Sequence, residues 1–194
     1  MTNKNSKFAK INVLIRGYDK EFADYDVYTC TSTLIRDGGN NIVVDPGSPK
    51  KGILKKALKN QGLELDDINY IFTTHYHTDH ARDRALFPNA KQVDIWGYNV
   101  GDRYYFESEK GFKITQNVSV IPTPGHAREH SSLIVKTVNG IVVIAGDVWW
   151  YKNFTPKIDP YAVNQHDLEK SRKKILEMAD YVIPGHGDIV KVKK

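Results

Sequence analysis

The sequence predicts a layered α/β protein, and three observations support this fold class. Short apolar runs of strand length occur in both halves of the chain, two segments carry apolar residues at helical spacing, and Gly, Asn or Pro separates most of these runs. No internal repeat or low-complexity linker divides the sequence. Its 194 residues suit one core, so we expect a single domain over residues 1–194.

The first half begins with strands. Apolar residues alternate over residues 11–15, and a second apolar-rich run covers residues 29–35. The Gly and Asn residues at 38–41 predict a turn into a third run at 42–44, which together make a β-meander. From Ser48 the apolar spacing becomes helical and continues to a stop at Asn60-Gln61-Gly62.

The second half also combines strands with a helix, and it follows a short buried strand predicted at residues 70–72. Further strands are predicted at residues 93–96, 118–121, 132–138, 141–145 and 181–183. A helix is predicted before the last of these strands, from the spacing of Leu168, Arg172, Ile175, Leu176 and Ala179. His166 has no motif around it and is expected at the start of that helix.

The composition indicates the cellular location of the protein and the charge of its binding partners. No apolar run approaches the roughly 20 residues of a membrane helix, and the polar N-terminus lacks the apolar core of a secretory signal. We therefore expect a soluble cytoplasmic protein that does not bind to a membrane. Cys30 is the only cysteine and is expected as a buried, unpaired thiol. The net charge of +5 mildly favours anionic substrates or RNA.

The segment from Thr74 to His80 holds the densest group of metal-binding residue types. His75, His77, Asp79 and His80 directly follow the strand predicted at residues 70–72. Imidazole nitrogen and carboxylate oxygen are ligands that zinc prefers. The spacing of two makes His75 and His77 converge, whereas Asp79 and His80 point to a neighbouring position, which suggests two adjacent metals.

Three later segments each add one ligand-type residue after a strand-like run. They are Pro122-Thr-Pro-Gly-His126, Ile144-Ala-Gly-Asp147 and Ile183-Pro-Gly-His186. Taken singly, each residue is typical of a turn or a cap. Together with the first loop they supply seven ligands, which is enough for two metal ions.

This set resembles the metallo-β-lactamase superfamily, whose pattern His-x-His-x-Asp-His recurs at residues 75–80. The family's opening Asp-x-Gly turn is matched by Asp45-Pro46-Gly47. The resemblance covers nearly the whole chain and implies a four-layer αββα sandwich with the metal site at one edge of the sheets. In this fold the first zinc would be held by His75, His77 and His126. The second would be held by Asp79, His80 and His186, with Asp147 bridging the two.

Within the superfamily, two stretches resemble the short stand-alone group named metallo-β-lactamase domain-containing protein 1. They are residues 34–45 and 171–186. The chain departs from many relatives at Ala81-Arg82-Asp83, where small residues and glycine are common, so the substrate-facing rim is expected to differ.

The chemistry implied is that of a metal-dependent hydrolase with two zinc ions, with iron and manganese left open. A hydroxide that bridges the metals would attack a carbonyl or phosphoryl centre. Asp79 would orient it as the catalytic carboxylate and pass a proton to the leaving group. Asp45 and His130 are expected behind the ligands, as hydrogen-bonding supports.

Substrate contacts are predicted on both sides of the metal loops. Arg82 and Arg128 each adjoin a ligand segment and could anchor an anion, or could pair with Asp83 and Glu129. Trp149, Trp150 and Tyr151 follow the Asp147 loop, and at least one ring is expected as a wall over the metals, with core packing as the alternative for its neighbours.

The leading function is hydrolysis of a small-molecule ester, lactone, thioester or β-lactam. The first alternative is a phosphodiesterase or ribonuclease that grips RNA with this core alone or as a homodimer. An iron-dependent oxidoreductase of the same fold and a non-catalytic binding module are weaker alternatives. The intact ligand set argues against both, because the family's mono-iron branch does not need Asp79, His80 and His186, and degenerate members lose ligands.

Overall fold

The computed structural model describes residues 7–47 and 50–193. Residues 1–6, whose polar composition argued against a secretory leader, lie outside the described residues, and so does Ser48, where the first predicted helix begins. Within the described ranges, no helix is both long and apolar enough to span a bilayer.

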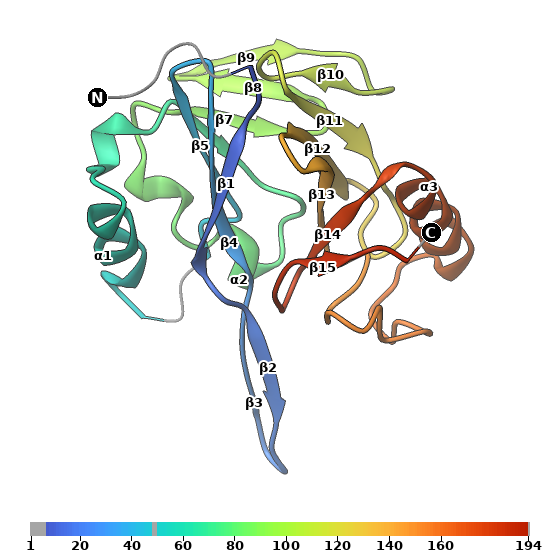
Figure 1. Ribbon diagram of the computed structural model, residues 1–194. Helices are drawn as coiled ribbons and strands as arrows, with labels where there is room; N and C mark the ends of the chain where they lie inside the picture. The colour runs from blue at the N-terminus through green and yellow to red at the C-terminus, as the bar shows by residue number, and fades with distance from the viewer. Residues whose placement is uncertain (1–6, 48–49, 194) are drawn as a thin grey trace.

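Two large mixed sheets form the centre of the molecule (Figure 1). The first runs in the order β1 (Lys10–Ile15), β4 (Ser32–Asp37), β5 (Asn40–Val44), β6 (Tyr70–Phe72), β7 (Lys91–Asp94), β8 (Gly97–Val100) and β9 (Arg103–Phe106). The second runs in the order β10 (Phe112–Lys113), β11 (Val118–Pro122), β12 (Ser131–Thr137), β13 (Gly140–Gly146), β14 (Tyr181–Pro184) and β15 (Val190–Lys191). Buried apolar residues of both sheets, among them Phe72 and Leu133, join in one cluster.

Helices cover the outer faces of the sheets (Figure 1). Leu54 and Leu58 of α1 (Ile53–Asn60) pack with Val43 and Ile71 of the first sheet. On the other side, α3 (Gln165–Met178) packs onto the second sheet through Leu168 and Ile175. The described residues also form the short helix α2 (Thr78–Ala81) and the 3-10 turns η1 (Leu65–Asp67) and η2 (Arg84–Leu86). These layers confirm the αββα sandwich.

A two-stranded hairpin extends from the sandwich (Figure 1). The sequence pattern did not predict this hairpin. It consists of β2 (Tyr18–Glu21) and β3 (Asp26–Thr29) and forms a sheet of its own. The strand predicted at residues 29–35 is therefore wrong as one element. It breaks at residues 30 and 31 because Thr31 hydrogen-bonds across to the second sheet's loop, through its amide to Gly185 O (2.6 Å) and its hydroxyl to Gly187 O (2.8 Å).

The strand predicted at residues 93–96 is displaced by two residues, because β7 covers Lys91–Asp94. It ends at Asp94 because the Asp94 carboxylate accepts the Trp96 amide (2.9 Å) and turns the chain. The unpredicted pair β8 and β9 follows, with the rings of Tyr98 and Tyr105 stacked across it. Cys30 is fully buried and unpaired, and His166 lies at the start of α3, both as predicted.

Parallel strand pairs bring the loops that contain the predicted metal ligands to one edge of the two sheets. Strands β5 and β6 run parallel in the first sheet, and β13 and β14 run parallel in the second. The segments that leave their carboxyl ends contain Asp45, the His75–His80 loop, Asp147 and His186. Residues far apart in sequence therefore meet where the two sheets end.

Candidate metal centre

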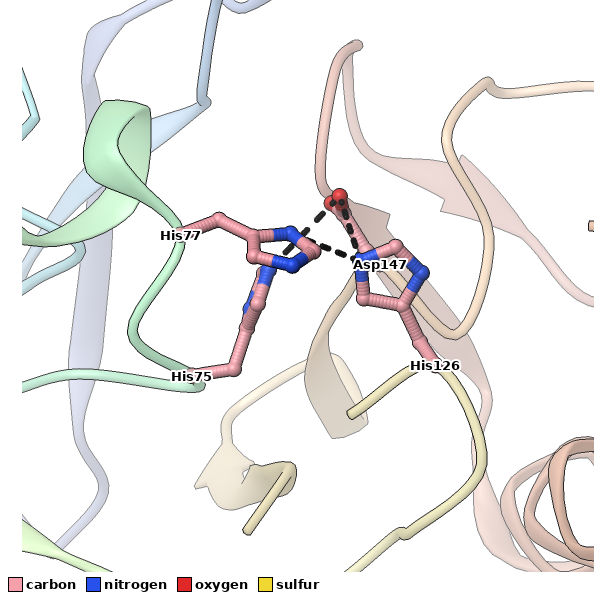
Figure 2. A group of neighbouring side chains, drawn as sticks. All are labelled: His75, His77, His126 and Asp147. Atoms are coloured by element: carbon pink, nitrogen blue, oxygen red, sulfur yellow. Dashed lines mark hydrogen bonds and ion pairs between the residues drawn. The ribbon is translucent and has the colours of Figure 1, made fainter. Parts of the chain in front are cut away.

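The seven predicted ligands converge into two adjacent groups. Within each group the ligand atoms lie within 4.8 Å of one another. The first group consists of His75, His77, His126 and Asp147, and the second of Asp79, His80 and His186. Six of the seven side chains are buried, and His77 is exposed. Figure 2 shows the first group, in which three rings and the Asp147 carboxylate point toward a common centre.

The local fold of the His75–His80 loop separates the two groups. His75 lies in a bend after β6 and His77 has an extended backbone, and α2 then turns Asp79 and His80 toward the second position. This turn requires close approach of another loop, because a Cβ on Gly47 would lie 1.2 Å from the Asp79 carbonyl oxygen. Glycine at position 47 is thus a packing requirement of the site.

Asp147 stands between the groups. Its Oδ1 lies 3.2 Å from His80 Nε2, and its Oδ2 lies 3.5 Å from both His126 Nε2 and His186 Nε2. One carboxylate therefore reaches histidines of both groups, which is the arrangement that a bridging ligand needs. A Cβ at Gly185 would come 1.7 Å from Asp147 Oδ1, so glycine is again required beside it.

Buried ligand atoms of this cluster lack ordinary hydrogen bonds. Among the described residues, no hydrogen-bond partner is present for His75 Nε2, His80 Nε2, Asp79 Oδ2 or Asp147 Oδ1. His80 Nε2 and Asp147 Oδ1 are near each other at 3.2 Å, yet not in hydrogen-bonding geometry. Because unpaired buried polar atoms are costly, this set fits cations better than it fits protein contacts alone.

Hydrogen bonds behind the rings fix which nitrogen faces the centre. His80 Nδ1 lies 2.8 Å from Asp45 Oδ2, and His186 Nδ1 lies 2.9 Å from the Thr29 carbonyl oxygen. In both rings Nε2 is left to face the cluster, as expected of metal-binding histidines. Asp45 also accepts hydrogen bonds from the Thr74 amide and hydroxyl at 2.8 and 2.9 Å, so its carboxylate contacts both Thr74 and the His80 ring.

Sequence reasoning missed Asp159, which supports His126. Its Oδ2 lies 2.6 Å from His126 Nδ1, and the side chain is fully buried. The residue follows a loop after Asp147 and precedes Pro160, so in the sequence it looks like an ordinary turn residue. Only the approach of residues 126 and 159 in the folded chain gives it this position.

His130 lies next to His75 of the first group. Its ring stacks on that of His75 at 5.0 Å between centroids, and Nδ1 is 3.0 Å from Thr123 Oγ1. Burial, reinforced by the charge of His126, lowers the pKa of His130 to about 3. The ring is therefore neutral near pH 7 and packs behind His75 without adding charge.

The protonation equilibria reflect competing burial and charge. Burial by itself would lower the pKa of His80, but the Asp147 and Asp45 carboxylates raise it well above its usual value. Burial would raise the pKa of Asp147, yet His80 and His186 lower it well below its usual value. Burial and the neighbouring His80 lower the pKa of His75. Positive charge beside Asp147 is thus favoured on His80 and disfavoured on His75.

A cavity of about 430 Å³ opens over the two groups. Of the predicted substrate residues, Trp150 lines it, whereas Trp149 is buried in the core against Phe154. Tyr151 stands behind the lining and donates its hydroxyl to Asp19 (3.0 Å). Neither Arg82 nor Arg128 is among the described residues that line this cavity.

The remaining lining comes from segments that sequence reasoning did not single out. The hairpin contributes Asp19, Glu21, Asp26 and Tyr28. Pro160 and Tyr161 contribute from the loop that also carries Asp159. The acidic residues alternate along β2, which was an available signal, but the strand itself had not been recognised.

The sandwich and its two adjacent groups of His and Asp side chains define a class of protein with a binuclear-type metal site. The family model of the metallo-β-lactamase superfamily matches residues 25–186. The chain belongs to this superfamily.

Two curated relatives illustrate the relationship. The chain is 31% identical over 191 residues to metallo-β-lactamase domain-containing protein 1 of Xenopus laevis, covering 95% of this chain and 82% of that protein. It is 34% identical over 159 residues to a protein named a probable metallo-hydrolase of Methanocaldococcus jannaschii, covering 79% and 74%. Against the similarly named mouse, human and rat proteins, the chain spans 58 to 61% of their length.

Two solved structures share the fold. One is an N-acyl homoserine lactone hydrolase with the product N-hexanoyl-L-homoserine at its catalytic metal centre, with a TM-score of 0.67, 19% identity and 88% coverage of both chains. The other is a peroxy diiron species of the chemotaxis sensor ODP, with a TM-score of 0.69, 19% identity and coverage of 96% of this chain and 87% of that one. These likenesses establish the architecture and leave the metal's identity open.

Proposed function

We propose that this protein is a binuclear zinc hydrolase of carbonyl substrates, namely an ester, lactone, thioester or β-lactam. One observation carries the proposal. Two groups of ligand-type side chains, with buried unpaired atoms, form the floor of an open cavity. The imidazole and carboxylate donor set suits zinc, and the cavity is large enough for a small molecule.

The proposed ligand roles follow the two groups. His75, His77 and His126 would hold one ion, Asp79, His80 and His186 the other, and Asp147 would contact both. When bound, the ions supply the Lewis acidity that activates water and polarises a carbonyl oxygen.

The chain's own residues would position the reactants. Asp79 lines the cavity, and its buried Oδ2 has no hydrogen-bond partner among the described residues, so it can accept a hydrogen bond from the attacking water and deliver a proton to the leaving group. Asp45 and Asp159 hold the His80 and His126 rings, which limits movement of the ligand atoms. Trp150 and Tyr161, stacked at 5.6 Å, would form one wall for substrate.

The lining also bears on the phosphodiesterase alternative. Among the described residues that line the cavity there are five carboxylates and no Lys or Arg. Phosphodiesters and RNA bind through cationic side chains. A cavity lined by carboxylates therefore favours hydrolysis of a carbonyl substrate over hydrolysis of a phosphodiester.

The test combines metal analysis with a substrate panel. Purified protein should contain close to two zinc ions per chain and should hydrolyse at least one of a lactone, thioester, aryl ester or β-lactam, with activity lost on chelation and restored by zinc. His75→Ala should abolish this activity, with His166→Ala in α3 as the matched control. One iron per chain, or full activity in His75→Ala, would refute the proposal.

A further inference from the structure

The hairpin places four side chains on the face that looks into the cavity. In its antiparallel register Asp19 pairs with Tyr28, and Glu21 pairs with Asp26. Side chains alternate between the faces of a strand, so these four share one face. All four line the cavity, while Lys20 and Val27 belong to the opposite face.

The pairing of Glu21 with Asp26 is unfavourable by itself. Like charges directly opposite each other in an antiparallel ladder repel. The chain as a whole carries a net charge of +5, yet its lysines and arginines contribute nothing to the described lining of this cavity. Negative charge is thus concentrated at the cavity mouth of a basic protein.

The floor of the same cavity is a separate indication of a ligand. Asp79 and Asp147 are each 5% exposed, and one oxygen of each has no hydrogen-bond partner among the described residues. Both line the cavity together with the three hairpin carboxylates. Metal ions would use the inner pair of carboxylates, and the outer three at the mouth would keep their charge.

An aromatic wall completes the mouth. Trp150 and Tyr161 stack with an interplanar angle of 17°, and Tyr28 of the hairpin is 46% exposed. Carboxylates combined with aromatic faces are the groups that bind ammonium ions in proteins. The Tyr151 hydroxyl holds Asp19 at 3.0 Å, which ties the hairpin to the segment carrying Trp150.

We propose that the substrate is an ester or lactone with a positively charged amine distant from its scissile carbonyl, bound through Asp19, Glu21 and Asp26 against the aromatic wall. The inference rests on the proposed hydrolase function and names its substrate class. In the reaction, the oxygen of water bonds to the carbonyl carbon and the C–O bond to the alkoxy group breaks. The leaving alcohol takes one proton of the water, and the other is released as the carboxylic acid product ionises.

Three aryl esters of equal chain length test this proposal with zinc-loaded protein. They are the 4-nitrophenyl esters of 6-(trimethylammonio)hexanoic acid and heptanoic acid, and the 4-nitrophenyl monoester of heptanedioic acid. The trimethylammonium group prevents self-cyclisation. We expect kcat/KM for the cationic ester to exceed that for the neutral ester about tenfold, with the anionic ester lower still.

Variants assign the preference to the hairpin. The triple variant Asp19→Asn, Glu21→Gln, Asp26→Asn should reduce the cationic-to-neutral ratio to about one. Asp102→Asn removes one charge at an exposed turn outside the lining and should leave the ratio unchanged. The wild-type ratio should also fall as ionic strength rises, which tests the charge effect without any mutation.

The outcomes separate the two claims. If no ester, including the neutral one, is hydrolysed in a zinc-dependent manner, the proposed function is wrong. If the neutral ester is hydrolysed but the cationic ester is not preferred, or if the triple variant keeps the preference, the substrate class is wrong and the hydrolase stands.

Discussion

The fold holds the floor and the rim of the cavity in different ways. The floor consists of the buried ligand-type residues, and the rim consists of Asp19, Glu21, Asp26 and Tyr28 of the hairpin. Floor residues leave the ends of strands inside the sandwich, are mostly buried, and are backed by partners such as Asp45 and Asp159. The rim lies on β2 and β3, which form a separate two-stranded sheet with largely exposed side chains. The difference teaches that, in the proposed enzyme, the rigid core would fix the reaction chemistry, whereas substrate choice would be assigned to an element that can vary without unfolding the core.

The largest expected effect is on the floor. Asp147→Asn should lower kcat/KM by about a thousandfold or more and reduce the metal content, because the carboxylate that reaches both ligand groups loses its charge. Steady-state kinetics with metal analysis checks this, with Asp102→Asn as control. Unchanged metal content and activity would remove Asp147 from the centre.

Substitutions in the sandwich core and in the hairpin should differ in their effect on the free energy of unfolding. Leu133 is fully buried between the sheets, so Leu133→Ala should lower the free energy of unfolding by about 2–5 kcal/mol. Val27 on the hairpin is 38% exposed, and Val27→Ala should cost about 0.5 kcal/mol or less. Urea unfolding of both variants makes the measurement. Equal losses would mean that the hairpin is part of the cooperative core.

The support behind the floor should have a smaller effect than the floor itself. Asp159→Asn should weaken metal affinity about ten- to a hundredfold, because the His126 ring loses its charged hydrogen-bond partner. Competition with a chromophoric chelator measures the affinity, and Asp167→Asn, at a partly exposed position of α3, serves as a matched control. An affinity equal to that of the control would show that Asp159 is merely packed beside the ring.

The smallest expected effect concerns the link between the rim and the sandwich. Tyr151→Phe removes the hydroxyl that holds Asp19 while keeping the ring. The cationic-to-neutral ratio should fall about two- to threefold, since a partly exposed hydrogen bond contributes modestly. The three-ester comparison measures it. A fall as large as that of the triple hairpin variant would instead indicate that Tyr151 organises the whole rim.

The ligand loops were predictable because their information is local. His75, His77, Asp79 and His80 lie within six positions, and the later ligands each follow a recognisable strand run. The separation of His75 and His77 from Asp79 and His80 also followed from spacing, because α2 acts within the loop itself. The placement of His126, Asp147 and His186 followed from the resemblance to the superfamily. The layered fold was predictable as well, since hydrophobic periodicity is a local property. The single domain over residues 1–194 and the homodimer stay predictions.

The supports and the rim were decided by the tertiary structure. Asp159 acquires its role only when it meets His126, 33 residues earlier in the chain, and Trp149 and Trp150 divide between core and cavity only once β13 is placed. The acidic mouth depends on the register of β2 with β3 and on where the hairpin stands over the floor. The sequence by itself thus determined the fold class and the residues able to bind metal, because periodicity and ligand spacing are short-range. Which side chains support those residues and which line the cavity depends on contacts between residues distant in sequence, which only the folded chain defines.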